Sequence, residues 1–449
     1  MWCHLFEHKA RTFFRTVEHL MMTAMVDYCQ RRIWRERKMT LPNFDKSLKQ
    51  YAELAVDIGV AVKPGDTVYL QIAVDQAKLA QLIVAAAYDR GAAEVQVQWH
   101  DDLIKRLDMA HMATSRLYNI PDFIKGQFDY WVDHNAKRIT VISADPDNLA
   151  GLDPQRIANY QNAFNQAYAR LMDAISSMKI SWTIIGAASP KWAEKVFPDA
   201  KTPEEATDKL WAAIFKTTRI DQPDPEAAWK AHDQQLRTKA DWLNTEQFDR
   251  LHYVAPGTDL VVGLPKHHIW EGAGAYNPRG EEFMANMPTE EVFTAPDFRR
   301  IDGTVASTKP LSYSGNILEG MHFTFKKGQV VDAHADRGDT VLQNLLKIPG
   351  ARSLGEVSLV PDPSPISQSG LIFFNTLYDE NASDHMALGQ AYPFSVKDGV
   401  AMTIDQRTAA GLNQSNTHVD FMMGSADMNI DGIKADGTVV PIFRNGDWA

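Results

Sequence analysis

Short apolar segments with strand character alternate with helical segments over the first half of this chain. The helical segment Gln76–Arg90, for example, ends at Gly91 and leads into a segment in which apolar and polar residues alternate. Neighbouring parallel strands need a crossover that is long enough to form a helix, so this alternation predicts a largely parallel sheet flanked by helices. The expected strands are Thr67–Ile72, Glu94–Trp99, Ile139–Ser143 and Trp182–Ile185.

The second half of the chain has a different pattern. The prolines and acids of Asp221–Pro225 interrupt the helical pattern, and a further helix is expected to run to about Asn244. Then Leu251–Val254 and Asp259–Leu264 flank a Pro-Gly-Thr turn, which is typical of a hairpin. We therefore predict an α/β protein with a Rossmann-like N-terminal domain over residues 39–222. A mixed α/β domain with antiparallel strands should follow over residues 223–449.

Residues 1–38 differ from both regions. They carry eight basic and four acidic residues, a net charge of +4 in a chain whose formal charge is −11. Residues 13–34 could form a basic amphipathic helix with a membrane-surface or targeting role. Alternatively, Met39 is the true start, because a well-formed domain pattern begins there, and the preceding residues are a poorly packed extension.

Charge and cysteine content exclude several classes of function. The net negative charge gives no global basic field for nucleic acid. The two cysteines, Cys3 and Cys29, lie near the N-terminus, so a metal site in the main body must use oxygen and imidazole ligands. No apolar run approaches the roughly 20 residues of a membrane span. The turn at Gln71–Asp75 also lacks the glycines of a dinucleotide site. A cytoplasmic protein that acts on small or peptidic substrates is the expectation.

Two acidic motifs in the second half could contribute to a catalytic site. Glu290 and Glu291 are neighbours on a segment of strand character, where adjacent side chains point to opposite faces, so only one of them should reach a common site. Glu356 lies in an apolar run that resembles a buried strand. A buried carboxylate needs a cation, a metal or a proton, and a structural salt bridge is the alternative explanation.

Two further motifs combine acids with histidine. Glu380 and His385 are too far apart to be neighbours on one helix face, so we expect Glu380 in a loop and His385 in the first turn of a helix. An N-capping role for Asn381 would explain part of this motif without a metal. His418 and Asp420 would project from one face of a strand and could bind one ion or an adjacent pair, unless His418 is a core histidine oriented by its aspartate.

Together these motifs offer four carboxylates and two histidines, enough to hold two divalent ions. Such a pair suits hydrolysis of a peptide bond, and it would equally suit cleavage of a phosphoester. The chain has neither the His-Glu-x-x-His helix of many zinc proteases nor the Gly-x-Ser-x-Gly turn of serine hydrolases.

Several longer motifs resemble those of the aminopeptidase T / aminopeptidase S family of metallopeptidases, from about Met39 to the C-terminus. Residues 1–38 have no counterpart in that pattern. The motifs are Pro288–Pro296, Gly303–Val305, Thr308–Leu311, Leu354–Glu356, Ser364–Ser367, Asn375–Ala382, His385 and His418–Asp420.

The resemblance implies a cytoplasmic, usually dimeric exopeptidase that removes N-terminal residues from peptides with two zinc, cobalt or manganese ions. Tyr392 matches a tyrosine that stabilises the tetrahedral intermediate, although it could simply pack against Pro393 and Phe394. Glu356 would serve both as ligand and in catalysis. A two-metal phosphoesterase and a non-catalytic oligomeric binding protein are the alternatives. The implied metal ligands are Glu290, Glu356, Glu380, His385, His418 and Asp420.

Overall fold

The structure is a computed structural model that describes residues 40–314 and 316–449. The chain divides into two units, Met1–Pro42 and Asn43–Ala449, and all elements discussed below belong to the second. The helix predicted for residues 13–34 lies outside the described residues.

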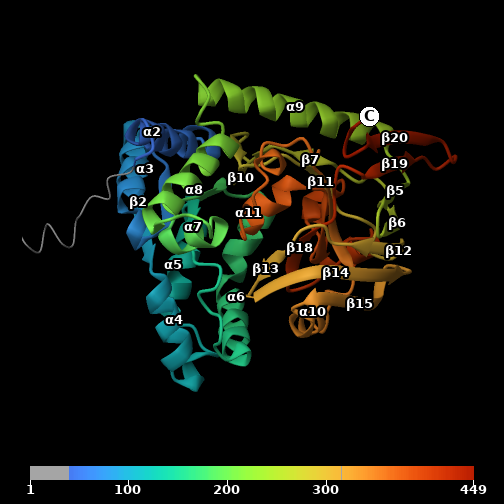
Figure 1. The fold of residues 1–449 in the computed structure, drawn as a ribbon, viewed down its shortest axis with the longest axis horizontal. Coiled ribbons are helices and arrows are strands. Elements are labelled where there is room, and N and C mark those ends of the chain that lie inside the picture. The colour runs from blue at the N-terminus through green and yellow to red at the C-terminus, as the bar shows by residue number, and fades with distance from the viewer. Residues whose placement is uncertain (1–39, 315) are drawn as a thin grey trace, which may run out of the picture. The chain divides into compact units, whose positions relative to one another are not determined.

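A parallel sheet occupies the N-terminal region of this unit, as the alternating pattern predicts (Figure 1). Its first four strands are β1 (Thr67–Ala73), β2 (Glu94–His100), β3 (Lys137–Ile142) and β4 (Trp182–Gly186). Helices α2 (Phe44–Leu54), α3 (Ala77–Asp89), α4 (Asp102–His111), α5 (Asp122–Asp133) and α6 (Pro154–Ser176) precede or connect these strands.

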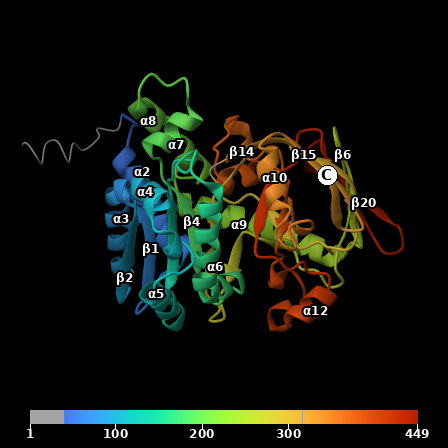
Figure 2. The ribbon, with the colours of Figure 1, turned by 90° about the horizontal axis from the view of Figure 1, so that it is seen from below.

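Helices cover both faces of this sheet. Side chains alternate along β1, so Val68 and Leu70 share one face, and α3 packs against β1 and β2. Tyr69 points to the other face, where its ring stacks on Trp131 of α5 at 3.5 Å between centroids. On this face Tyr69 and Trp131 belong to an apolar core that also includes residues of α6. Figure 2 shows β2, β1 and β4 in this order across the sheet, with α5 and α6 next to it; β3 lies between β1 and β4.

Four successive helices begin with the same local signal. Each of α6, α7 (Pro190–Val196), α8 (Pro203–Thr217) and α9 (Pro225–Glu246) has an N-cap side chain that accepts a backbone N–H, followed by proline at the first helical position. The first turn of a helix leaves backbone N–H groups without partners. The N-cap side chain accepts one of them, and proline has no N–H to satisfy. Asp224, which caps α9, belongs to the segment Asp221–Pro225 that interrupts the helical pattern in the sequence.

The fifth strand of the parallel sheet comes from much later in the chain. Strand β10 (Asn286–Met287) pairs with β4 in parallel, so the strand order is β10-β4-β3-β1-β2. Five residues after β10 the chain enters β11 (Val292–Thr294), which belongs to a different sheet. The short segment between them is therefore held between two sheets.

Antiparallel strands dominate the C-terminal region, as predicted. The hairpin predicted around the Pro-Gly-Thr turn is formed by β5 (Arg250–Ala255) and β6 (Thr258–Gly263). Their nine-stranded sheet also contains β12 (Ile301–Ala306), β13 (Leu311–Tyr313), β14 (Asn316–Lys326), β15 (Gln329–Arg337), β19 (Asn429–Ile433), β20 (Val439–Arg444) and β21 (Asp447–Trp448).

A second antiparallel sheet has the order β18-β17-β16-β11-β7. Its strands are β7 (Glu271–Gly272), β11, β16 (Leu354–Leu359), β17 (His385–Gly389) and β18 (His418–Met422). A small hairpin is formed by β8 (Gly274–Tyr276) and β9 (Glu282–Met284), and short helices α10 (Asp339–Leu345), α11 (Thr376–Asp379) and α12 (Ile404–Ala409) connect the strands.

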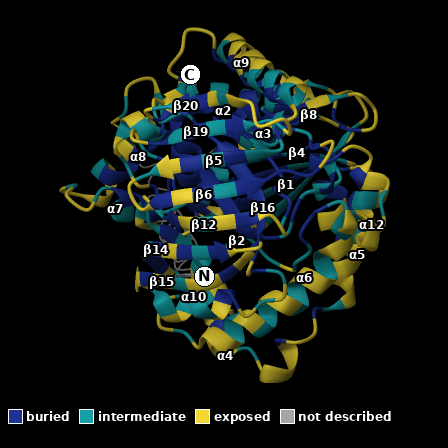
Figure 3. Ribbon diagram, turned by 90° about the vertical axis from the view of Figure 1, so that its right-hand side faces the viewer, coloured by how far each residue is buried: buried dark blue, intermediate teal, exposed yellow. Residues whose placement is uncertain are grey.

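The two antiparallel sheets share one apolar core, to which α9 contributes. It includes Leu260 and Val262 of β6, Val357 of β16 and Phe421 of β18. Figure 3 shows buried residues along β5, β6 and β16, whereas α4 and α5 carry many exposed ones. One face of the sheet that contains β16, β17 and β18 therefore packs against this apolar core, and its other face can carry polar groups.

Candidate metal centre

Three adjacent strands present acids and histidines from one face. In the register of β16, β17 and β18, Glu356 is opposite Ala387, and Ala387 is opposite Asp420. Side chains two residues apart share a face, so His385 and His418 lie on the same side as these residues. The intervening residues, such as Val357 and Phe421, point into the apolar core. The alternation predicted for His418 and Asp420 is confirmed.

A glycine allows the strand that carries Glu356 to bend at this point. The register between β16 and β17 shifts between Leu354 and Glu356, which marks an irregularity at Gly355. A Cβ atom at this position would lie 2.3 Å from the carbonyl oxygen of Gln390. Glycine is therefore required where the backbone of Gln390, two residues before Tyr392, passes the strand.

Glu356 lies at the centre of the cluster. One of its carboxylate oxygens is 3.5 Å from Nε2 of His385, and the other is 3.5 Å from Nε2 of His418. His418 Nε2 is also 3.4 Å from the carboxylate of Asp420. Glu356 is 5% exposed, so bulk water does not solvate its carboxylate.

Both imidazole rings are oriented by backbone carbonyls. Nδ1 of His385 lies 2.9 Å from the carbonyl oxygen of Glu380, and Nδ1 of His418 lies 2.7 Å from that of Gln390. A neutral ring that donates its Nδ1–H to a carbonyl keeps its lone pair on Nε2, which in both residues faces the acids. This is the arrangement in which histidine binds a metal ion, with the second nitrogen anchored by the surrounding protein.

Glu291 joins the cluster, whereas Glu290 does not. The Glu291 carboxylate lies 3.1 Å from Nε2 of His385 and accepts a hydrogen bond of 2.6 Å from the hydroxyl of Ser358. The neighbouring Glu290 points away and pairs with Arg219 at 2.8 Å. One acid of the pair reaches the site, as the alternation requires, but it is Glu291. Ser358, two residues after Glu356 on the same strand face, was not a candidate in the sequence.

The segment before His385 differs from the sequence prediction. His385 is the first residue of strand β17 and not part of a helical turn, because the chain returns to an extended conformation at Ser383. Glu380 lies in a short 3-10 turn directly after α11. Asn381 caps no helix; its side-chain oxygen accepts the backbone N–H of Glu290 at 2.8 Å, and α11 is capped by Asn375.

The acids and histidines form overlapping groups that could each hold an ion. Within the described residues three such groups occur, and their ligand atoms lie within 4.8 Å of one another. Glu356 belongs to two of them, as do His385 and Asp420. The groups are Glu291 with Glu356 and His385, Glu356 with His418 and Asp420, and Glu380 with His385 and Asp420.

Burial and mutual repulsion change the protonation of this cluster. Burial raises the pKa of Glu356, and burial together with the charge of Asp420 raises the pKa of Glu380 well above its ordinary value. Burial opposes charge on His418, but Asp420 and Glu356 outweigh it and raise its pKa to about 10. Without another cation, protons must therefore balance the acids, and a divalent ion bound here would take their place.

Tyr392, for which the family resemblance implies a catalytic role, lies beside this cluster. Its ring centroid is 5.0 Å from that of His418, and it stacks on Phe394 at 5.2 Å. Burial and the charges of Glu356 and Asp420 raise the pKa of its phenol well above 10, so it is a neutral hydrogen-bond donor at physiological pH. Packing and a catalytic role are thus both compatible with its position.

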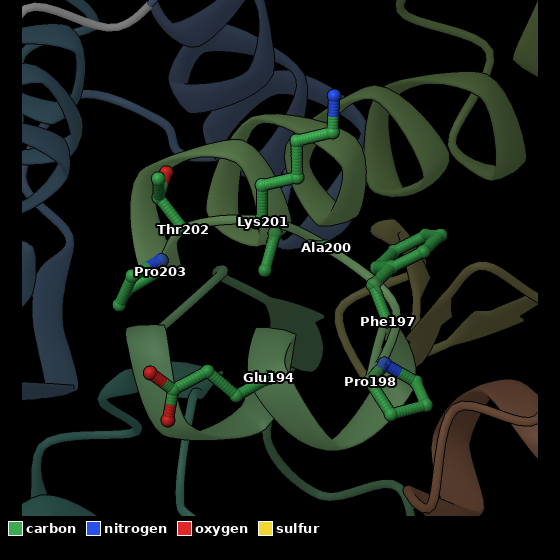
Figure 4. A pocket seen from close by; sticks show the side chains of 8 residues that line it. Glu194, Phe197, Pro198, Ala200, Lys201, Thr202 and Pro203 are labelled. Carbon is green, nitrogen blue, oxygen red and sulfur yellow. The ribbon is translucent and has the colours of Figure 1, made fainter.

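Two surface pockets are lined by residues outside the cluster. One, of about 110 Å³, is formed between α7 and α8 by residues that include Glu194, Phe197 and Thr202 (Figure 4). The other, of about 350 Å³, is lined by Arg219 and residues that include Gln368. Neither contains a residue of the three acid and histidine groups.

Comparison with known proteins identifies the family. The model of the thermophilic metalloprotease (M29) family matches residues 44–448. The chain belongs to this family. It is therefore a metal-dependent peptidase, and the acids and histidines of the cluster are of the chemical types that such an enzyme needs.

Individual members of this metalloprotease family match over nearly their whole length. Aminopeptidase PepS of Streptococcus thermophilus is 55% identical over 411 residues, which cover 91% of this chain and 100% of that protein. Aminopeptidase AmpS of Bacillus subtilis is 48% identical over 410 residues, again 91% and 100%. The structure of wild-type AmpT from Thermus thermophilus has a TM-score of 0.85 and 38% identity, and covers 90% of this chain and 100% of that one.

The region matched by the family model begins at residue 44, close to Met39, where the sequence pattern of a domain begins. Among the helices that the structure describes, none has the length and apolar character needed to cross a membrane.

Proposed function

We propose that this metalloprotease is an aminopeptidase that binds two divalent cations and hydrolyses the first peptide bond of peptides with a free N-terminus. Glu356, which faces both histidines, would hold the ions together with the other acids and histidines of the cluster. The proposed ligands are Glu291, Glu356, Glu380, His385, His418 and Asp420. They differ from the set expected from the sequence only in Glu291, which replaces Glu290.

The observation that carries this proposal is the charge balance of the cluster. Four largely buried carboxylates meet two imidazoles, and each imidazole already uses Nδ1 on a backbone carbonyl. With all four acids ionised, even two imidazolium ions would leave an excess of two negative charges. A buried excess of this size needs further cations, and carboxylate with imidazole is a suitable ligand set for zinc, cobalt or manganese.

Bound divalent cations would polarise the scissile carbonyl and lower the pKa of a water molecule. The chain itself supplies the surroundings. The Tyr392 phenol is neutral and lies beside His418, where it can donate a hydrogen bond to the oxyanion of the tetrahedral intermediate. Glu356 would act both as ligand and in proton transfer. Any carboxylate not engaged by a metal could hold the free amino group of the substrate.

Three further features extend the proposal beyond the site. We infer that the enzyme is cytoplasmic and forms a homodimer, as the resemblance to its family implies. Peptides are the substrates that the names of its aminopeptidase relatives indicate. The choice among zinc, cobalt and manganese depends on affinity and on supply in the cell.

Metal removal tests the proposal directly. Dialysis against a chelator should abolish cleavage of aminoacyl-arylamides, and zinc, cobalt or manganese should restore it. Peptides with an acetylated N-terminus should remain uncut, since they lack the free amine. Metal analysis should find about two ions per chain. Activity that survives complete metal removal, or turnover of p-nitrophenyl phosphate in preference to every aminoacyl substrate, would reject the proposal.

A further inference from the structure

The segment that carries Glu291 is fixed by residues from the N-terminal region. Before it, β10 pairs with β4, with Met287 opposite Ile185, and the N–H of Ile184 donates to the carbonyl of Ala285 at 2.8 Å. After it, β11 pairs with β16. Four residues, 288–291, join a strand of one sheet to a strand of the other.

Glu290 is the anchor of this segment. Its side chain is 6% exposed, and its two carboxylate oxygens lie 2.8 and 3.0 Å from Nη2 of Arg219. His232 of α9 lies 3.4 Å from the same carboxylate and 2.7 Å from the carbonyl oxygen of Thr289. The backbone N–H of Glu290 donates to Asn381. Both the side chain and the backbone of Glu290 are thus held.

Arg219 is itself placed by an unusual backbone conformation. It follows α8 with φ of 61°, a left-handed conformation that costs energy for a residue with a side chain. Its guanidinium lies 5.1 Å from the ring centre of Trp229 on α9. Two helices therefore hold one cation against Glu290, and tertiary contacts must compensate for the backbone strain.

The orientation of Glu291 follows from that of Glu290. The side chains of these neighbours contact different partners, so holding Glu290 on Arg219 restricts Glu291 to the direction of Ser358 and His385. Asn381 links the same anchor to a second proposed ligand, because it is adjacent to Glu380 and its amide lies 3.4 Å from that carboxylate.

We propose that the Arg219–Glu290 ion pair is a positioning device through which the N-terminal region sets the metal affinity of the site. This inference rests on the proposed function. Arg219 and Glu290 would not touch the ions or the substrate; they act through Glu291 and Asn381.

Cobalt binding to the folded protein tests this role. Chelator competition and the visible d–d spectrum report on Co²⁺ directly, and unfolding of the metal-free form reports on stability. Loss of contacts around metal ligands commonly weakens binding by about 10- to 100-fold. We expect a loss of that size in Glu290→Gln and in Arg219→Met, with an altered spectrum. The double variant should lose no more than the weaker-binding single variant, since the two residues act as one unit.

Asp57→Asn provides a matched control. Asp57 pairs with Arg90 through two contacts of 2.7 and 2.8 Å in the N-terminal region, with no contact to the proposed ligands. It should bind Co²⁺ like the wild type. Arg219→Lys, which keeps the positive charge, serves if the other variants fail to fold, and its Co²⁺ affinity should fall between those of wild type and Glu290→Gln.

The outcomes separate the possible failures. Wild-type affinity in any folded Arg219 or Glu290 variant overturns the positioning role. Tighter binding in Arg219→Met also overturns it, because that result would mean that a freed Glu290 is itself a ligand. A wild-type protein that binds no Co²⁺ and needs no metal for activity instead overturns the proposed function.

Discussion

Two buried charge clusters in this metalloprotease differ in how their charges balance. At the start of β3, the ammonium of Lys137 is fully buried and lies 2.9 Å from Asp66 and 3.1 Å from Glu281, and Arg279 lies 2.8 Å from Glu281. Two basic and two acidic groups make this cluster neutral. The cluster around Glu356 contains four carboxylates and two imidazoles, so with its acids ionised it stays negative even when both rings are protonated.

The difference separates a structural ion cluster from a site built for cations. Lys137 also donates to the carbonyl of Ala61 at 2.5 Å, so the neutral cluster satisfies its own charges and hydrogen bonds. It ties β3 to the β8–β9 region through Glu281. The cluster around Glu356 cannot be satisfied by the described side chains alone. Buried acids are therefore informative about function only after their cationic partners have been counted.

The largest expected effect is that of Glu356→Gln. This change removes the carboxylate that faces both histidines, and kcat/KM for aminoacyl-arylamides should fall by at least about 1,000-fold, or about 4 kcal/mol of transition-state stabilisation. The Glu281→Gln variant removes one acid from the neutral cluster and is the matched control. It should keep its activity and metal content. Equal losses of activity in both variants would mean that the charge balance of a cluster does not distinguish a structural cluster from a catalytic one.

Lys137→Met should reverse this pattern. It leaves two acids without their buried cation, which commonly destabilises a protein by about 3–5 kcal/mol. Because Asp66 and Glu281 are partly exposed, the unfolding free energy should fall by about 3 kcal/mol, the lower end of this range. Activity per folded, metal-loaded molecule should be unchanged.

Urea unfolding of the metal-free protein measures this effect. Lys179→Met, which removes a well-exposed partner of Asp173, should change stability by less than about 0.5 kcal/mol. A Lys137→Met protein that is as stable as wild type, or that no longer binds metal when folded, would contradict the distinction between the two clusters.

Ser358→Ala tests how finely the negative cluster is arranged. The Ser358 hydroxyl is buried and donates to Glu291, so its loss leaves the proposed ligand with one fewer contact that fixes its orientation. Metal affinity should fall by about 10-fold, near the lower end of the range for such contacts, while most of kcat at saturating metal is retained. Ser358→Thr keeps the hydroxyl and is the control. An unchanged affinity in Ser358→Ala would show that Glu291 needs no such support.

Periodicity was a sufficient guide to most of the fold. The parallel strands, the hairpin of β5 and β6, and the face shared by His418 and Asp420 all follow from local patterns of apolar and polar residues. The pairing of β10 with β4 could not be predicted in this way. It joins two residues of one region to the edge strand of a sheet, with the paired residues Ile184 and Asn286 more than 100 positions apart, and a two-residue strand has no periodicity to detect.

The candidate site was predictable in composition but not in every residue. Alternation shows that Glu290 and Glu291 face opposite ways, yet it cannot say which face meets the site, because that depends on Arg219 and on the register of β11. The helical turn expected at His385 was wrong for a related reason. Spacing alone does not distinguish a helix start from a return to extended backbone at Ser383. Ser358 carries no signal of its own until the register pairs it with His385.

The smallest expected effect concerns His268. It is a buried histidine without acidic partners, so it can be compared with the histidines of the Glu356 cluster. Its Nδ1 lies 2.9 Å from the carbonyl oxygen of Pro265 and its buried Nε2 has no partner. Burial lowers its pKa, so the folded state keeps it neutral while the unfolded chain binds a proton below about pH 6.5. This contribution to stability is complete above that pH and is lost progressively as the pH falls.

His268→Asn, whose amide can replace the Nδ1 donor, should therefore lose less stability than wild type between pH 7.5 and pH 5. The difference should be on the order of 1 kcal/mol. Urea unfolding of the metal-free proteins at both pH values measures it, and the exposed neighbour His267 provides the control variant His267→Asn, which should follow wild type. A wild-type pH dependence in His268→Asn would mean that burial does not keep this imidazole neutral. Burial would then be a weak constraint on charge in this protein, and the buried acids around His385 and His418 would be a weaker argument for bound cations.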